Sequence, residues 1–155
     1  MNNQYTYNYL LVGEGLPAFE KIRLEDIIPS IDEILRQSNN RLTCLEKNIT
    51  PTWEGIVEPL TIIEEKIKWT WGIVNHLMGV KNSKELREIY QTVQPDIISF
   101  LNKLRQNKLI YQTFKDLRKD SVLWNTLDSC QKRIITSSIR EAELSGVNLT
   151  PDKRH

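Results

Sequence analysis

The most regular pattern in the chain is the stretch IVEPLTIIEEKIKWTWGIVNHLM, residues 56–78. Its apolar side chains recur every three or four residues, which is the period of an amphipathic α-helix, and its charged side chains lie off that stripe. The stripe consists of Ile56, Leu60, Ile63, Ile67, Trp71, Val74 and Met78. We expect Thr52 to cap this helix and Pro59 to kink its first turns. A helix from near Trp53 to near Met78 is on the order of 38 Å long.

Four further segments show the same period, separated by glycine, proline and capping residues. Their apolar faces are, in order, Ile28, Ile31, Leu35, Leu42 and Leu45; Leu86, Tyr90, Val93, Ile97, Leu101 and Leu104; Ile110, Phe114 and Leu117; and Trp124, Leu127, Ile134, Ser138 and Ala142. Ser83 is the expected N-cap of the helix that contains Leu86, and Asn107 of the helix that contains Ile110. Pro95 is expected to bend or break the first of these two helices. No segment alternates with a period of two over the length of a strand. The sequence therefore predicts an all-α fold, an array or bundle of about five long antiparallel helices, some kinked at proline.

Three regions follow from this pattern. We expect residues 1–23 to form an extended N-terminal arm, residues 24–146 a helical domain, and residues 147–155 a linker with the start of a truncated next helix. Gly146 is a helix stop, because glycine adopts the left-handed C-cap conformation without a Cβ penalty. The stretch Thr150–Asp152 is a helix start, since it offers an N-cap oxygen, a proline suited to the first helical position and an acid in the first turn.

Composition indicates an ordinary folded chain of 155 residues, 39% of them hydrophobic and 26% charged. The 21 basic and 20 acidic residues give a formal net charge of +1, and no basic face is visible, so no nucleic-acid partner is expected. The N-terminus lacks the pattern of a signal peptide, and no segment has the roughly 20 apolar residues that a membrane span needs. We therefore expect a cytoplasmic protein without a membrane partner.

The residue types that carry chemistry are few. Neither His76 nor His155 belongs to a His-Glu-x-x-His motif, in which the histidines bind zinc and the glutamate activates water. We interpret His76 as a structural histidine packed among apolar residues, because a zinc site needs three or four convergent ligands. Cys44 and Cys130 lack a C-x-x-C spacing and a visible base, and we expect both thiols to be buried.

Other polar and aromatic groups are also better explained by structure. Glu64–Glu65 and Glu141–Glu143 fit solvated helix faces, because acid–base catalysis also needs a pocket that shifts pKa values. Gly13–Gly15 is a G-x-G without the strand before it or the third glycine of a phosphate loop. Trp71 and Trp124 lie on apolar stripes and are expected in the core. The sequence thus predicts no catalytic, cofactor-binding or metal-binding residue in this chain.

Four groups of residues follow one another in an order that suggests a family. They are Gly15-Leu16-Pro17-Ala18-Phe19 with Glu25-Asp26-Ile27-Ile28-Pro29; Pro51-Thr52-Trp53-Glu54 with Pro59-Leu60; Trp71, Val74, His76-Leu77, Val80, Asn82, Leu86-Arg87 and Tyr90; and Ser145-Gly146-Val147-Asn148-Leu149. Together they resemble the beginning of the M3 zinc oligopeptidases, which include thimet oligopeptidase and dipeptidyl carboxypeptidase, with oligopeptidase A as the most similar subgroup. Asp26 and Gly55 depart from this pattern, where the family has histidine and asparagine, and the departures concern local turns.

The resemblance implies an N-terminal helical domain that forms part of the wall of a deep channel for short peptides. It implies zinc for the full-length family enzyme, whose metal ligands lie in a downstream part that nothing here matches, so no cofactor is expected in this chain. The implied partners are the catalytic half of the peptidase and, in the complete enzyme, an oligopeptide substrate. The alternative is a free-standing helical module that binds a protein or peptide. As an enzyme by itself, the chain is predicted to be inactive.

Packing against a catalytic half predicts apolar residues that stay exposed on this domain. We expect such a surface at Ile73, Leu77, Ile98 and Ile135, which lie outside the main stripes. Self-association of the chain through this surface would follow. The alternative is that the stripes are wide and that these side chains lie inside the bundle.

The helical pattern gives a direct test of fold class. We expect the far-ultraviolet circular dichroism of the purified chain to be that of an almost entirely α-helical protein, and its thermal unfolding to be one cooperative transition, because each helix has an apolar face to bury. A spectrum with a substantial β-sheet contribution would contradict the prediction.

Overall fold

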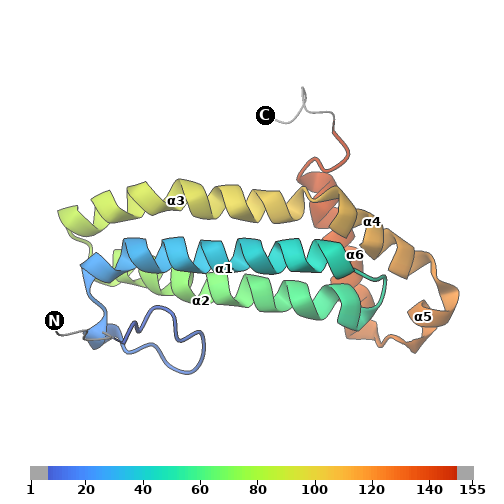
Figure 1. The fold of residues 1–155 in the computed structure, drawn as a ribbon, viewed down its shortest axis with the longest axis horizontal. Helices are drawn as coiled ribbons and strands as arrows, with labels where there is room; N and C mark the ends of the chain where they lie inside the picture. Colours follow the sequence, from blue (N-terminus) through green and yellow to red (C-terminus); the bar gives the residue numbers. More distant parts are fainter. Residues whose placement is uncertain (1–6, 150–155) are drawn as a thin grey trace. The chain divides into compact units, whose positions relative to one another are not determined.

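A computed structural model describes residues 7–149 (Figure 1). Those residues form helices and no strand, which confirms the predicted all-α class. The α-helices are α1 (Ile27–Asn48), α2 (Glu58–Val80), α3 (Lys84–Arg105), α4 (Lys108–Lys119), α5 (Ser121–Thr126) and α6 (Ser129–Leu144). Two 3-10 helices, Phe19–Lys21 and Leu24–Asp26, precede α1, and a π-helical segment, Trp53–Val57, precedes α2.

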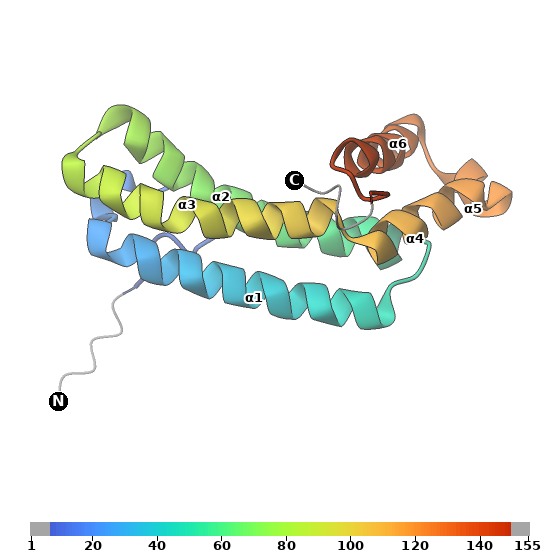
Figure 2. The ribbon, with the colours of Figure 1, turned by 90° about the horizontal axis from the view of Figure 1, so that it is seen from above.

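The chain divides into two compact units. Among the described residues, the first comprises 7–40 and 62–97 and the second 41–61 and 98–149, so α1, α2 and α3 each contribute to both. Within the first unit these three helices run alongside one another, with α2 antiparallel to α1 and α3 (Figures 1 and 2). The domain boundaries expected after residues 23 and 146 stay predictions, and the helix start expected at Thr150–Asp152 lies outside the described residues.

The core of the first unit comes from the arm and from the facing sides of the three helices. Its buried apolar residues are Leu10, Ile27, Ile31, Ile34, Ile63, Ile67, Ile73, Val74, Leu77, Leu86, Val93 and Ile97. Most of them are three, four or seven residues apart along a helix, as the helical period of the sequence predicts. Polar Ser30 and Thr70 lie among them and are also buried.

In the second unit, α4 packs against α5, α6 and the segment Trp53–Val57. The buried apolar residues of this unit are Leu42, Leu45, Ile56, Val57, Leu60, Phe100, Leu104, Ile110, Tyr111, Phe114, Leu117, Ile135, Ile139, Ala142 and Val147. None of the helices in the described part of the chain is both long and apolar enough to cross a membrane.

Side-chain caps begin the helices where the sequence predicts them. The hydroxyl oxygens of Thr52 and Ser83 accept hydrogen bonds from the backbone N–H of the third residue after each, at 3.0 and 3.1 Å. The side-chain oxygen of Asn107 accepts two, from Leu109 and Ile110, at 3.0 and 3.1 Å. These bonds satisfy donors that a helix N-terminus otherwise leaves unpaired.

The expected fifth helix is two helices, which corrects the prediction. Asp128 accepts a hydrogen bond from the backbone N–H of Gln131, whose side chain accepts one from the backbone of Asp128. This capping box starts α6 and ends the run of α5 at Leu127. Pro95, in contrast, lies inside a continuous α3, and the bend expected there stays a prediction.

The predicted exposed apolar surface is largely wrong. Ile73, Leu77 and Ile135 are buried, and only Ile98, at 47%, is exposed. On α1 the reverse error occurs, because Ile27 is buried and Ile28 is exposed. On α2 the buried arc is wider than the predicted stripe, since Ile73 and Leu77 are buried together with Val74. On α1 and α6 the buried face is shifted by one residue, since Ile27 and Ile135 are buried while Ile28 and Ile134 are exposed.

Gly146 ends α6 as the sequence predicts. Its φ angle is +79°, in the left-handed region. The Gly146 N–H donates to the carbonyl of Glu143 at 3.0 Å, and the Val147 N–H donates to that of Ala142 at 3.1 Å. This pair of bonds is the Schellman motif, and the Val147 side chain that follows Gly146 is buried.

Replacement of Gly146 by alanine should therefore destabilise the chain by about 1–2 kcal/mol, the cost of a side chain in the left-handed region. The new Cβ would also lie 2.9 Å from the Leu149 Cδ1 atom, which must move. Gly79→Ala is the matched control, because its added Cβ meets nothing within 4 Å and its φ is not positive. We expect it to be neutral or stabilising by up to about 1 kcal/mol. Urea unfolding measures the stability of both variants. Equal changes in the free energy of unfolding would contradict the assignment of Gly146 as a left-handed helix cap.

Candidate functional site

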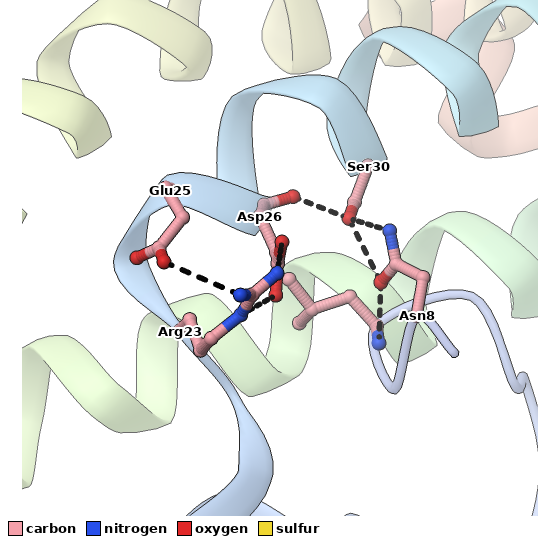
Figure 3. Close-up of polar contacts among 6 residues, drawn as sticks. Asn8, Arg23, Glu25, Asp26 and Ser30 are labelled. Atoms are coloured by element: carbon pink, nitrogen blue, oxygen red, sulfur yellow. Dashed lines mark hydrogen bonds and ion pairs between the residues drawn. The ribbon is translucent and has the colours of Figure 1, made fainter. Parts of the chain in front are cut away.

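The N-terminal arm is fixed to α1 by a cluster of polar side chains (Figure 3). The amide nitrogen of Asn8 donates to the hydroxyl oxygen of Ser30 at 2.8 Å, and its amide oxygen accepts from the Leu10 N–H at 3.0 Å. The Ser30 hydroxyl contacts the backbone carbonyl of Asp26 and, at 3.1 Å, the amide oxygen of Asn8. Asn8 thus orders its own turn and holds it against the first turn of α1.

Arg23 orders the other end of this region. Its guanidinium donates two hydrogen bonds to the carboxylate of Asp26, at 2.8 and 2.9 Å, and lies 3.6 Å from Glu25 (Figure 3). The hydrogen bond to Asp26 and the charge of that carboxylate raise the pKa of Arg23 above its usual value. The pair is solvent-exposed, so it fixes geometry more than it contributes stability.

A buried hydrogen bond ties the arm to α2. The Thr70 hydroxyl donates to the backbone carbonyl of Leu10 at 2.8 Å. Both residues are 1% exposed, so neither group has water as an alternative partner. This bond joins two residues that are sixty apart in the sequence, and it holds the arm against the buried face of α2.

Two further contacts in the first unit are between aromatic rings. The Phe19 ring lies against the His76 ring, with centroids 4.8 Å apart. This contact agrees with the interpretation of His76 as a packed structural histidine, although its side chain is exposed and lies outside the apolar core. Trp71 stacks on Tyr90 at 4.7 Å and is half-buried.

A small pocket lies along the arm in the first unit. It has a volume of about 200 Å³ and is lined by Tyr7, Tyr9, Val12, Leu16, Pro17, Ala18 and Trp69. We call it the arm pocket. Each of these side chains is uncharged, and three are aromatic. The indole Nε1 of Trp69 is buried and has no hydrogen-bond partner among the described residues.

The second unit has its own polar cluster, on the segment that follows α6. The Tyr111 hydroxyl donates to Glu143 at 2.8 Å and accepts from the amide of Asn148 at 3.2 Å. Gln106 donates to the carbonyl of Ser145 at 3.0 Å. Glu143 therefore fixes the end of α6 rather than forming a carboxylate pair with Glu141.

The remaining candidates of the sequence also have structural settings. Glu64 forms an exposed ion pair with Lys68 at 2.6 Å. Cys44 and Cys130 are exposed, which corrects the expectation of buried thiols. Gly13 and Gly15 have φ angles of +80° and +73° and shape the loop that carries Leu16.

Zinc requires at least three convergent protein ligands. Among residues 7–149, no group of three or more histidine, cysteine, aspartate or glutamate side chains could hold a metal ion. The described residues therefore do not fit the zinc that the resemblance implies for the full-length enzyme, and we derive no chemical step through it. That the chain carries no catalytic or cofactor-binding residue stays a prediction.

Sequence reasoning missed the residues that hold the arm. Asn8, Ser30 and Thr70 are common polar residues with no recognisable motif. The one available signal was position, because Ser30 and Thr70 fall on the apolar faces of their helices, where an isolated hydroxyl is unfavourable. Their partners lie too far along the sequence to be deduced from spacing.

Comparison with known proteins finds one family that matches most of the chain. Residues 31–154 match the family described as neurolysin/thimet oligopeptidase, N-terminal domain. The match covers most of the chain, which therefore belongs to this family and is the N-terminal domain of an M3 oligopeptidase.

Individual relatives specify the subgroup. Probable cytosolic oligopeptidase A of Arabidopsis thaliana is 39% identical over 147 residues, which are 95% of this chain. Oligopeptidase A of Haemophilus influenzae is 35% identical over 147 residues, and that of Escherichia coli 32% over 148. The chain spans only about a fifth of the length of these relatives, 21%, 21% and 22% respectively.

The buried bond between arm and α2 can be tested by Thr70→Val. We expect a loss of about 1–3 kcal/mol of stability, because the Leu10 carbonyl is left buried without its partner, and faster proteolysis of residues 7–23. Thr92→Val is the control, since the Thr92 hydroxyl donates to the Glu88 carbonyl on an exposed surface. Chemical unfolding and limited proteolysis of both variants measure the difference. Equal stability would show that the Leu10 bond does not hold the arm.

Proposed function

We propose that this chain is the non-catalytic N-terminal domain of an M3-type zinc oligopeptidase that hydrolyses short peptides, and that it forms part of the substrate-channel wall. The observation that carries the proposal is the match of residues 31–154 to the N-terminal domain family. The similarity of 95% of the chain to proteins named oligopeptidase A supports it.

The length and packing of the helices suit the proposed role of the domain in the wall of a substrate channel. Its three longest helices have 22, 23 and 22 residues, and each presents buried apolar side chains to its neighbours within a unit. Close-packed interiors of this kind resist deformation. The arm, which has little regular structure, is fixed through Asn8 and Thr70, so this face also keeps a defined shape.

The partners follow from this role. The catalytic half of the peptidase packs on the domain and supplies the zinc, and an oligopeptide is the substrate of the complete enzyme. The cytoplasm is the proposed compartment, in agreement with the name of the cytosolic Arabidopsis relative.

A free-standing module that binds a protein or peptide is the second candidate. The arm pocket favours it, because an uncharged pocket with exposed apolar residues at its rim suits an apolar ligand. The reading frame after His155 separates the two candidates. A frame that continues into a His-Glu-x-x-His motif supports the peptidase, and a frame that ends there supports the module.

The proposal predicts a division of activity. The purified 155-residue chain should retain no stoichiometric zinc after dialysis against a weak chelator, and it should not cleave short peptides. The full-length product of the same gene should hold zinc and cleave them, and a strong chelator should abolish the cleavage. Elemental analysis and a quenched-fluorescent peptide assay measure both. One equivalent of retained zinc, or peptide turnover by the short chain alone, would contradict the proposal.

A further inference from the structure

The loop between the arm and the first 3-10 helix presents apolar residues to solvent. Leu16 is 96% exposed, Tyr7 63% and Val12 39%, and all three line the arm pocket. Single exposed apolar residues are common on protein surfaces, but a group of them around an apolar pocket marks a contact surface.

This loop is held at both ends, which limits the positions that its tip can take. Before the tip, Asn8 bonds to Ser30 and the Leu10 carbonyl to Thr70. After it, the Phe19 ring packs against His76. Pre-organisation of this kind lowers the entropy cost of binding, because the loop need not be ordered by its partner.

One polar group that lines the pocket has no hydrogen-bond partner among the described residues. The Trp69 indole N–H is buried without an acceptor among the described residues, which is an unfavourable state for a strong donor. A backbone carbonyl brought in with an apolar side chain would satisfy it. Because the nitrogen is already covered, such an acceptor reaches it only after a small shift of the neighbouring side chains.

The size of the pocket limits what it binds. A volume of about 200 Å³ is below the roughly 300–1,000 Å³ of small-molecule sites, whereas a cavity of about 150 Å³ accommodates benzene. The arm pocket therefore takes a single apolar or aromatic side chain. The contact of one side chain gives little affinity to a free ligand, but it suffices for a covalently attached segment, whose effective concentration is in the millimolar range.

We infer that the arm pocket and Leu16 form a docking surface for the part of the enzyme that follows this domain, which inserts one apolar side chain between Leu16 and Trp69. The inference rests on the proposed function. It agrees with the length of the relatives, because this chain spans 21%, 21% and 22% of them and most of each relative lies outside the matched region.

Accessibility of a thiol at the loop tip tests the surface. Leu16→Cys is prepared in the 155-residue chain and in the full-length product of the same gene, and alkylation by N-ethylmaleimide is followed by peptide mass spectrometry. We expect the introduced thiol to react as fast as the exposed native Cys130 in the short chain and at least tenfold more slowly in the full-length protein. Denaturation in urea should restore fast labelling.

Hydrogen exchange of the two unsubstituted proteins provides a second measurement, in case the substitution disturbs folding. Amides of residues 11–18 should exchange at least tenfold more slowly in the full-length protein. Equal labelling and equal exchange in both proteins would overturn the docking surface while leaving the peptidase assignment intact. A reading frame that ends at His155 would overturn both. Protection that appears in the short chain and grows with its concentration would assign the surface to a second copy and overturn the inference.

Discussion

Burial of the apolar face of α2 is the constraint on which the rest of the structure depends. Most of the stability of a helix in a protein comes from the packing of its apolar face and not from helix propensity. Its buried residues serve both units, with Leu60 in the second and Ile63, Ile67, Val74 and Leu77 in the first. In the first unit α1 and α3 supply matching apolar faces, which explains why three long helices run alongside one another there.

The same face also explains the arm. Thr70 occupies a buried position on α2, where an unpaired hydroxyl would be unfavourable, and the Leu10 carbonyl pairs with it. Ser30 has the equivalent role on α1 with Asn8 as its partner. Two polar interruptions of otherwise apolar faces thus become attachment points for a segment with little secondary structure of its own. Leu10, itself fully buried, adds the apolar anchor between them.

The residues that first suggest chemistry make contacts that fix local structure. Glu143 holds the Tyr111 hydroxyl, Glu64 pairs with Lys68, and the His76 ring packs on Phe19. The chain belongs to the family of the neurolysin/thimet oligopeptidase N-terminal domain and spans about a fifth of the length of the relatives described above. The role proposed for these contacts is to keep the helices and the arm in one defined arrangement.

The sequence by itself determined the helical class, the caps at Thr52, Ser83 and Asn107, the stop at Gly146 and the family, because each depends on residues close together in the chain or on their order. It did not determine that Ile27 rather than Ile28 is buried, that Asp128 divides the last predicted helix, or that Ile73, Leu77 and Ile135 lie inside while both cysteines lie outside. Periodicity locates an apolar face only approximately, because the elements that pack against a helix decide which residues at the edges of that face are buried. The attachment of the arm was likewise decided by tertiary structure, since Asn8 and Leu10 find their partners 22 and 60 residues away. A hydrogen bond over such a separation forms only after packing has brought its two groups together.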